Sequence, residues 1–157
     1  MLKRSEKISV VISCIIGAVF LVALVFAAFW LPVVVNSMID VTDNIGNRNE
    51  ISQLGRALIL IDAYAMLSLA ALAVGFLFFL LSTVYRHEVF SKRATGLISA
   101  ISWCCFGESL LSLLLITQFQ LVIIVTLAAC FLGLCLRVVR QVIDEASRIK
   151  AENDFTI

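Results

Sequence analysis

A single acidic residue interrupts one of the apolar segments of this sequence, and it is the residue best placed to do chemistry. Glu108 lies in the run from 94 to 116, roughly 21 Å along a helix that rises about 1.5 Å per residue. A carboxylate is costly at that depth, and no Lys, Arg or His lies inside an apolar segment to neutralise it. Glu108 is therefore either a neutral acid in a buried hydrogen bond, or a carrier of a proton or cation, or a contact for a ligand.

Three hydroxyl-bearing residues are the expected polar partners of Glu108. Ser112 follows one helical turn later, and Ser68 and Thr126 lie at comparable depth in other apolar segments. A second acid, Asp62, lies near the start of its segment, where a helix N-terminus favours negative charge, and we expect it to anchor the outer interface. The two acids differ in depth by over ~10 Å, so a catalytic carboxylate pair is not expected.

The remaining reactive residue types form no catalytic or metal-binding pattern in the sequence. The 5 cysteines lie inside apolar runs, and the single histidine, His87, lies apart from them. This placement predicts packed, inert thiols rather than disulfides or zinc ligands. The sequence has no Gly-rich phosphate loop and no convincing nucleophile–base pair, so we expect no enzymatic activity, no cofactor and no metal.

Composition identifies the elements that must position these residues. Of 157 residues, 62% are hydrophobic and 15% are charged, which is too apolar for an ordinary soluble domain. A net charge of +1 gives no reason to expect direct nucleic-acid binding. The apolar runs predict one all-α membrane domain over 1–157, a four-helix bundle with a C-terminal helical extension. The expected spans are 8–35, 57–85, 94–116 and 121–136, and the cytoplasmic tail is 137–157.

The distribution of basic residues predicts the orientation of the spans. All but two of the 12 Lys and Arg residues flank the N-terminus, the loop after the second span, or the fourth span on its C-terminal side. The two exceptions, Arg48 and Arg56, fall in the first loop. The positive-inside rule therefore places both termini in the cytoplasm. Trp30 and Tyr64 fall near the outer boundary, where Pro32 is expected to kink or end the first helix.

The tail has the periodicity of an amphipathic helix. Its apolar residues recur at helical spacing and its charged residues fall on the other side, with Asp144 four residues before Arg148. The apolar set is Val138, Val139, Val142, Ile143, Ala146 and Ile149. Such a helix is either a stalk that continues the fourth span or a docking surface for a cytoplasmic protein.

Two short segments predicted to be cytoplasmic resemble a bacterial family, the "domain of unknown function 2975" proteins. That family has a loop built around Pro-Phe followed by polar residues, and the stretch here is Val89-Phe90-Ser91-Lys92-Arg93. Family members tend to end in a Glu-Asn-Asp-Leu-Thr-Ile type sequence, and this chain ends in Glu152-Asn153-Asp154-Phe155-Thr156-Ile157. The chain thus has Val in place of Pro and Phe in place of Leu. Ser91 is also a candidate N-cap for the third span.

The resemblance implies a multi-pass protein of the bacterial inner membrane with no assigned activity. Similar proteins are often encoded beside a small helix-turn-helix regulator, which implies a cytoplasmic protein partner for the two matching segments. Our leading hypothesis is therefore a non-enzymatic sensor or interaction protein. The alternative is transport of protons, ions or small solutes through a homo-oligomer, because four spans rarely enclose a pathway alone. The lipid bilayer is an expected partner under both hypotheses.

Overall fold

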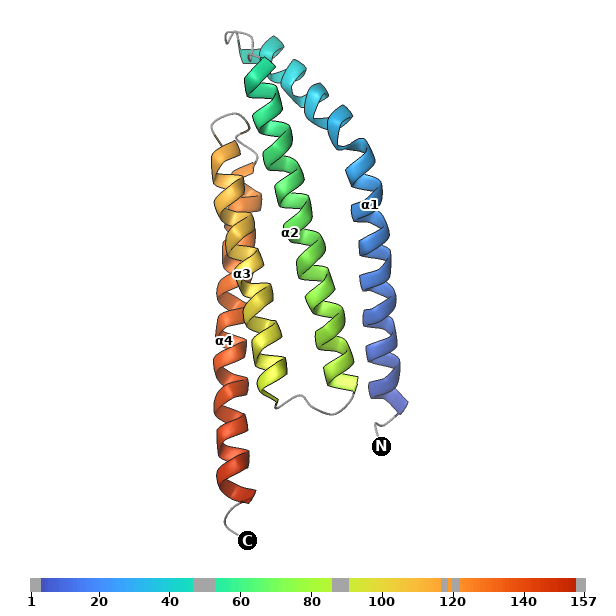
Figure 1. Cartoon of the computed structure of the whole chain (residues 1–157), viewed down its shortest axis with the longest axis vertical. Helices are drawn as coiled ribbons and strands as arrows, with labels where there is room; N and C mark the ends of the chain where they lie inside the picture. The colour runs from blue at the N-terminus through green and yellow to red at the C-terminus, as the bar shows by residue number, and fades with distance from the viewer. Residues whose placement is uncertain (1–3, 47–52, 86–90, 117–118, 120–121, 155–157) are drawn as a thin grey trace.

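Four long helices make up the fold (Figure 1). The computed structural model describes residues 4–46, 53–85, 91–116, 119 and 122–154. In chain order the helices are α1 Arg4–Gly46, α2 Gln53–Tyr85, α3 Lys92–Leu115 and α4 Val122–Asp154. The described parts of the chain contain no strand. The prediction of an all-α four-helix fold is confirmed.

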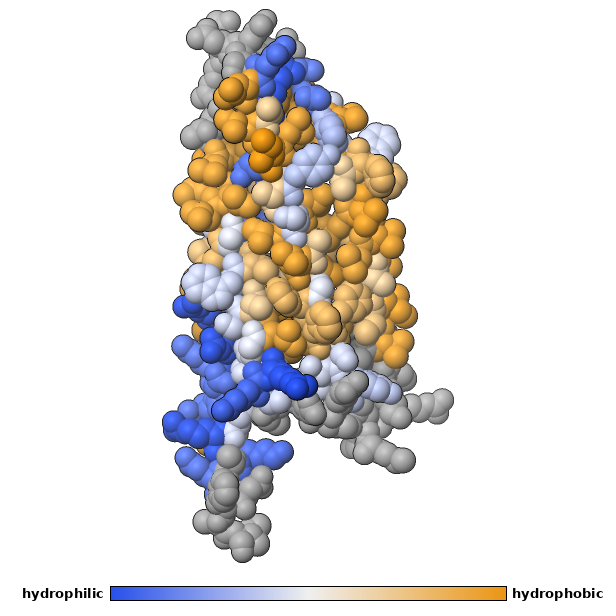
Figure 2. All heavy atoms as spheres, in the orientation of Figure 1, coloured by the Kyte–Doolittle hydropathy of each residue, from blue (hydrophilic) through white to orange (hydrophobic). Residues whose placement is uncertain are grey.

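Each helix has an apolar stretch long enough to cross a bilayer. The outward surface of these stretches is apolar, and Phe29 of α1, for example, is 78% exposed. Figure 2 shows hydrophobic residues covering the middle of the visible face, while hydrophilic residues gather at its upper end and on the lower part of α4. A surface of this kind is stable when lipid tails cover it. The chain is thus a multi-pass α-helical membrane protein.

The helices pack in the order in which the chain visits them. Among the described residues, α1 packs on α2, α2 on α3, and α3 on α4, and no other pair of helices is in contact. Glycines permit close approach at two of these interfaces: a Cβ on Gly17 would lie 3.1 Å from the Phe78 ring, and one on Gly107 would lie 3.1 Å from Leu69. Because α4 contacts neither α1 nor α2, no enclosed central channel forms within these parts of the chain.

Helix α1 continues through Pro32 rather than ending there. Proline has no N–H, so the carbonyl of Ala28, four residues earlier, loses its helical partner. The Tyr64 hydroxyl on α2 donates a hydrogen bond to this carbonyl oxygen over 3.3 Å. Beyond Pro32, α1 turns toward α2 (Figure 1), and Val35 and Ile39 pack there against Ile59. The neighbouring helix therefore satisfies the backbone group that the proline releases.

The start of α3 and the course of α4 agree with what the sequence predicts for them. Ser91 is the N-cap of α3, and its Oγ accepts a hydrogen bond from the Ala94 N–H over 3.2 Å. The fourth span and the predicted tail form one uninterrupted helix, α4. The start of α1 and the end of α4 lie on the same side of the molecule, and α4 continues past the start of α3 (Figure 1).

Candidate functional site

Glu108 lies in the second half of α3, and its side chain is partly buried. One helical turn earlier on α3 is the buried thiol-bearing side chain of Cys104. Within the described residues no hydrogen bond or ion pair reaches the Glu108 carboxyl group. The expected partners therefore do not bind it directly: the Ser68 hydroxyl, for instance, donates to the Ala65 carbonyl of its own helix over 2.7 Å.

Ser112 and Thr126, two of those expected partners, bind each other instead. Their hydroxyl oxygens are 2.8 Å apart across the α3–α4 interface, and both residues are buried. Ser112 Oγ also lies 3.0 Å from the Ser109 carbonyl, and Thr126 Oγ1 lies 3.1 Å from the Val122 carbonyl. Two hydroxyls carry two protons, so one of these three hydrogen bonds is unmade at any moment. The pair closes the α3–α4 hairpin near its turn.

Further polar contacts hold the rest of this hairpin together. The buried Ser102 hydroxyl donates to the carbonyl of Gly133 over 2.9 Å, and the Arg140 guanidinium donates to Ser99 Oγ over 3.1 Å. A Cβ on Gly133 would lie 3.3 Å from the Phe106 ring, so glycine is what allows the backbone this close. Hydrogen bonds and close packing replace the hydrophobic driving force that lipid cannot supply.

Arg137 is a functional candidate that inspection of the sequence did not single out. Its guanidinium carbon lies 5.2 Å from the centre of the Trp103 ring and 5.5 Å from that of Phe106, a cation–π arrangement on the surface of α3. With Arg140 bound to Ser99, this places the first part of the predicted tail beside α3. The connection between α3 and α4 is short, so the two helices are antiparallel. Counting back from that turn along both helices places Arg137 at the level of Trp103, and this count could have identified the contact from the sequence.

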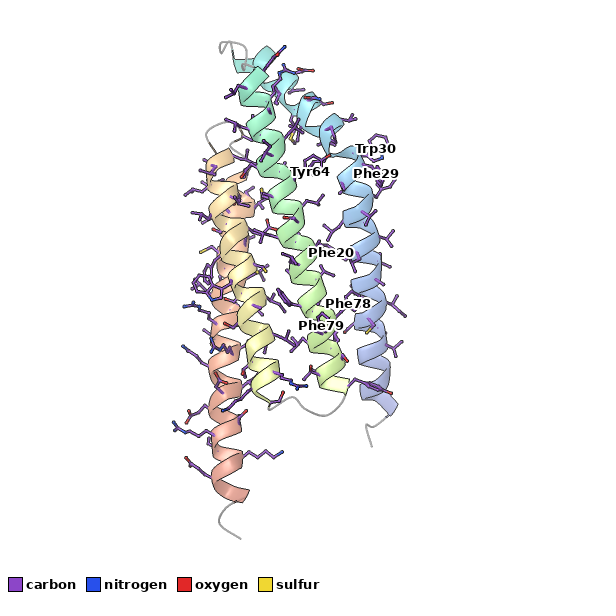
Figure 3. All side chains as sticks on the ribbon, in the orientation of Figure 1. Phe20, Phe29, Trp30, Tyr64, Phe78 and Phe79 are labelled. Carbon is purple, nitrogen blue, oxygen red and sulfur yellow. The ribbon has the colours of Figure 1, made fainter. Side chains whose placement is uncertain are left out.

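Asp62 lies toward the opposite end of the molecule from the α4 extension, by which we mean the part of α4 from Arg137 to Asp154. Its Oδ2 atom is buried and has no hydrogen-bond partner among the described residues. Nearby on α2, Arg56 forms an ion pair with Asp40 of α1 at 3.1 Å, and both side chains are substantially exposed. Further along α2, the Tyr64 hydroxyl joins α2 to α1 through its hydrogen bond to the Ala28 carbonyl (Figure 3). Asp62 thus lies within the packed α1–α2 hairpin. Glu108 lies at the level of Leu69 on α2, because its neighbour Gly107 packs there, so the two acids are at different depths.

The candidate partner-binding residues are only partly within the described chain. Glu152 is exposed on the last turns of α4, and Asn153 and Asp154 are helical. Four others lie outside the described residues: Phe90, Phe155, Thr156 and Ile157. Ser91 caps α3, and that contact is a sufficient structural reason for its presence.

The reactive groups of the described chain remain dispersed. The cysteines are free thiols, and within the part of the chain that the structure describes no three His, Cys, Asp or Glu residues gather as metal ligands would. Comparison with family models, with curated proteins and with solved structures gave no match in any of the three. The resemblance to the domain of unknown function 2975 family therefore stays a prediction.

Proposed function

We propose that this membrane protein is a non-enzymatic interaction protein whose α4 extension binds a cytoplasmic protein. The observation that carries the proposal is the continuity of α4, a single helix from Val122 to Asp154. Polar contacts of Ser99, Ser102 and Ser112 fasten its first part to α3, and its last turns continue past α3 (Figure 1). A continuous helix moves as a unit, so a displacement within the membrane reaches the surface at its end.

The end of α4 has a surface suited to a protein partner. Arg148 forms ion pairs with Glu145 at 2.8 Å and with Glu152 at 3.8 Å, all on the exposed side of the helix. Exposed pairs of this kind contribute little stability, so a partner's charges can replace them at low cost. The family resemblance suggests a helix-turn-helix regulator as that partner and the bacterial inner membrane as the location.

The orientation that this proposal requires follows from the basic residues. Most basic residues of α3 and α4 lie toward the molecular end at which α1 begins and α4 ends (Figure 1). They are Lys92, Arg93, Arg140, Arg148 and Lys150. The positive-inside rule puts that end in the cytoplasm. Reporter domains fused to the C-terminus test this: a reporter active only in the cytoplasm should work there, and one active only outside should not.

Capture of the partner from native membranes tests the binding surface. Full-length tagged protein should retain a protein that is lost when residues 152–157 are deleted or when Arg148→Glu breaks the α4 ion pairs. Gln53→Glu is the control, because Gln53 is exposed at the start of α2, at the other end of the molecule and outside both family-like segments. Equal retention by all four proteins would contradict a binding site at the end of α4.

Transport through an oligomer is the second candidate, and the partly buried Glu108 carboxyl group favours it. Within the described residues it has no hydrogen bond, and a lone intramembrane acid is often a proton or cation site. In proteoliposomes, Glu108→Gln should then abolish pH-dependent flux while Asp62→Asn retains it. Absence of flux from the unmodified protein, or equal flux from the Glu108→Gln variant, would dismiss this candidate.

A further inference from the structure

The side of α4 that faces away from α3 carries an unbroken apolar pattern. Its residues alternate at spacings of three and four along the helix, and we call them the α4 seam: Val125, Ala128, Leu132, Cys135, Val139, Val142, Ala146 and Ile149. The large members of the seam are well exposed, from 47% for Val139 to 62% for Val142. The opposite side of the helix, with Thr126 and Gly133, is buried against α3.

Lipid tails account for the first half of the seam but not for its second half. From Arg137 onward α4 carries charged residues, yet all four seam positions from Val139 to Ile149 are apolar. Because Arg140 lies beside Ser99, near the start of α3, the Ile149 end of the seam continues past that start (Figure 1). The cover for this surface must therefore extend from the membrane into water.

The seam has the seven-residue repeat of a two-stranded coiled coil. Apolar residues at the first and fourth positions of each repeat are what such helices bury against each other. In the first half of the seam, the small side chains of Ala128 and Cys135 allow the close approach that helix pairs use in membranes. A second α4 is the partner whose apolar surface has the same length and the same course out of the membrane.

Charge supports a parallel pairing of two copies. Two copies inserted in the same orientation have parallel α4 helices, and in that arrangement Glu145 of one flanks the seam opposite Lys150 of the other. Glu145 bonds to Arg148 of its own helix, but this contact is exposed and readily exchanged. We propose that the α4 seam joins two copies of this chain in a parallel, two-fold symmetric dimer.

The dimer makes different predictions for two cysteines on α4. Cys135 is in the seam at a fourth position, where a residue faces its own counterpart across the two-fold axis. Disulfides need Cα atoms about 4.4–6.8 Å apart, which that position allows. Cys130 follows Thr126 by one helical turn, and Thr126 bonds to α3, so Cys130 lies toward α3 and away from the seam. The proposal does not depend on a protein partner at the end of α4, because no seam residue belongs to the Arg148 ion pairs and the two surfaces share only the flanking Glu145.

Cysteine crosslinking in lipid vesicles tests the dimer with full-length protein. One variant retains Cys135 and has alanine at the other four cysteines, and the control retains Cys130 alone. Copper(II)–phenanthroline and dioxygen remove two electrons and two protons from a thiol pair, and one S–S bond forms. The Cys135 protein should give a reducible dimer that persists when lipid is added in excess, whereas the Cys130 protein should stay monomeric. No dimer from Cys135, or equal dimer from both, would overturn the proposal.

A charge in the seam provides a second, independent measurement. Val142→Lys in the Cys135 protein buries a charge in each copy and should lower the association constant of the dimer, read from crosslinking at several protein-to-lipid ratios, by about tenfold, equivalent to about 1.4 kcal/mol. Gln141→Lys adds the same charge at the neighbouring exposed position outside the seam and should leave crosslinking unchanged. Circular dichroism confirms that both variants remain helical. An equal loss in both variants would contradict the assigned interface.

Discussion

The hydrogen bond from Tyr64 to the Ala28 carbonyl exists because Pro32 leaves that carbonyl without its helical partner. Two substitutions should therefore be coupled. Tyr64→Phe removes the donor and leaves the carbonyl unsatisfied between α1 and α2. Pro32→Ala restores an N–H four residues after Ala28, so the carbonyl regains a bond within α1. Tyr64→Phe should lower the free energy of unfolding measurably when Pro32 is present and hardly at all when it is replaced by alanine.

The magnitude follows from the geometry of this contact. A backbone carbonyl facing lipid has no water to bond, so its lost hydrogen bond counts more than one at an exposed aqueous site. The bond is long, at 3.3 Å, and Tyr64 remains 44% exposed, which argues for the lower part of the usual range. Interhelical hydrogen bonds in membranes average about 0.6 kcal/mol and reach about 1.7 kcal/mol. We expect a coupling free energy of about 0.6 kcal/mol.

A double-mutant cycle in mixed micelles measures this coupling. The free energy of unfolding is obtained from titration with a denaturing detergent for the unmodified chain, both single variants and the double variant. The coupling free energy is the difference between the effect of the double variant and the sum of the two single effects. Any change in stability that Pro32→Ala causes by relaxing the α1 bend is therefore subtracted. Tyr85→Phe is the control, since the structure describes no hydrogen bond for that hydroxyl. A coupling below about 0.3 kcal/mol, within the usual additivity error, would refute the carbonyl-rescue reasoning.

The same assay tests three further contacts. Ser112→Ala and Thr126→Val should each lower the free energy of unfolding, with a coupling of about 0.6 kcal/mol from their shared hydrogen bond. Gly133→Leu should cost about 2 kcal/mol by overpacking the α3–α4 contact, whereas Gly96→Leu, at a position with open space, should cost nothing. Asp62→Asn should raise stability by up to about 1 kcal/mol, because a neutral amide is cheaper to bury than an unpaired carboxylate oxygen.

Specific outcomes would count against each of these expectations. Additive effects at Ser112 and Thr126 would show that their contact contributes no free energy of its own. Equal stability of the Gly133→Leu and Gly96→Leu proteins would mean that α3 and α4 do not pack closely in the membrane. A marked loss of stability in Asp62→Asn would indicate that the carboxylate has a favourable partner.

Apolar periodicity and charge placement were enough to predict the helices. The spans, the Ser91 cap and the continuity of α4 depend on local sequence and on the roughly 30 Å thickness of a bilayer. The partners of polar side chains were less predictable. Equal depth suggested Thr126 as a partner for Glu108, but helix rotation directs Thr126 to Ser112 instead. Depth fixes one coordinate of a side chain, whereas its rotation about the helix axis depends on packing.

The sequence by itself determined that this chain is a helical membrane protein, because its long apolar runs are stable in few other environments. It also determined which residues are exceptions inside those runs. Only the tertiary structure decided which exceptions meet: Tyr64 with the carbonyl opposite Pro32, and Arg137 with two aromatic rings of α3. It likewise decided which side of α4 remains uncovered. The physical reason is that lipid favours every apolar surface equally, so close packing and hydrogen bonds, rather than hydrophobicity, select the neighbours of each helix.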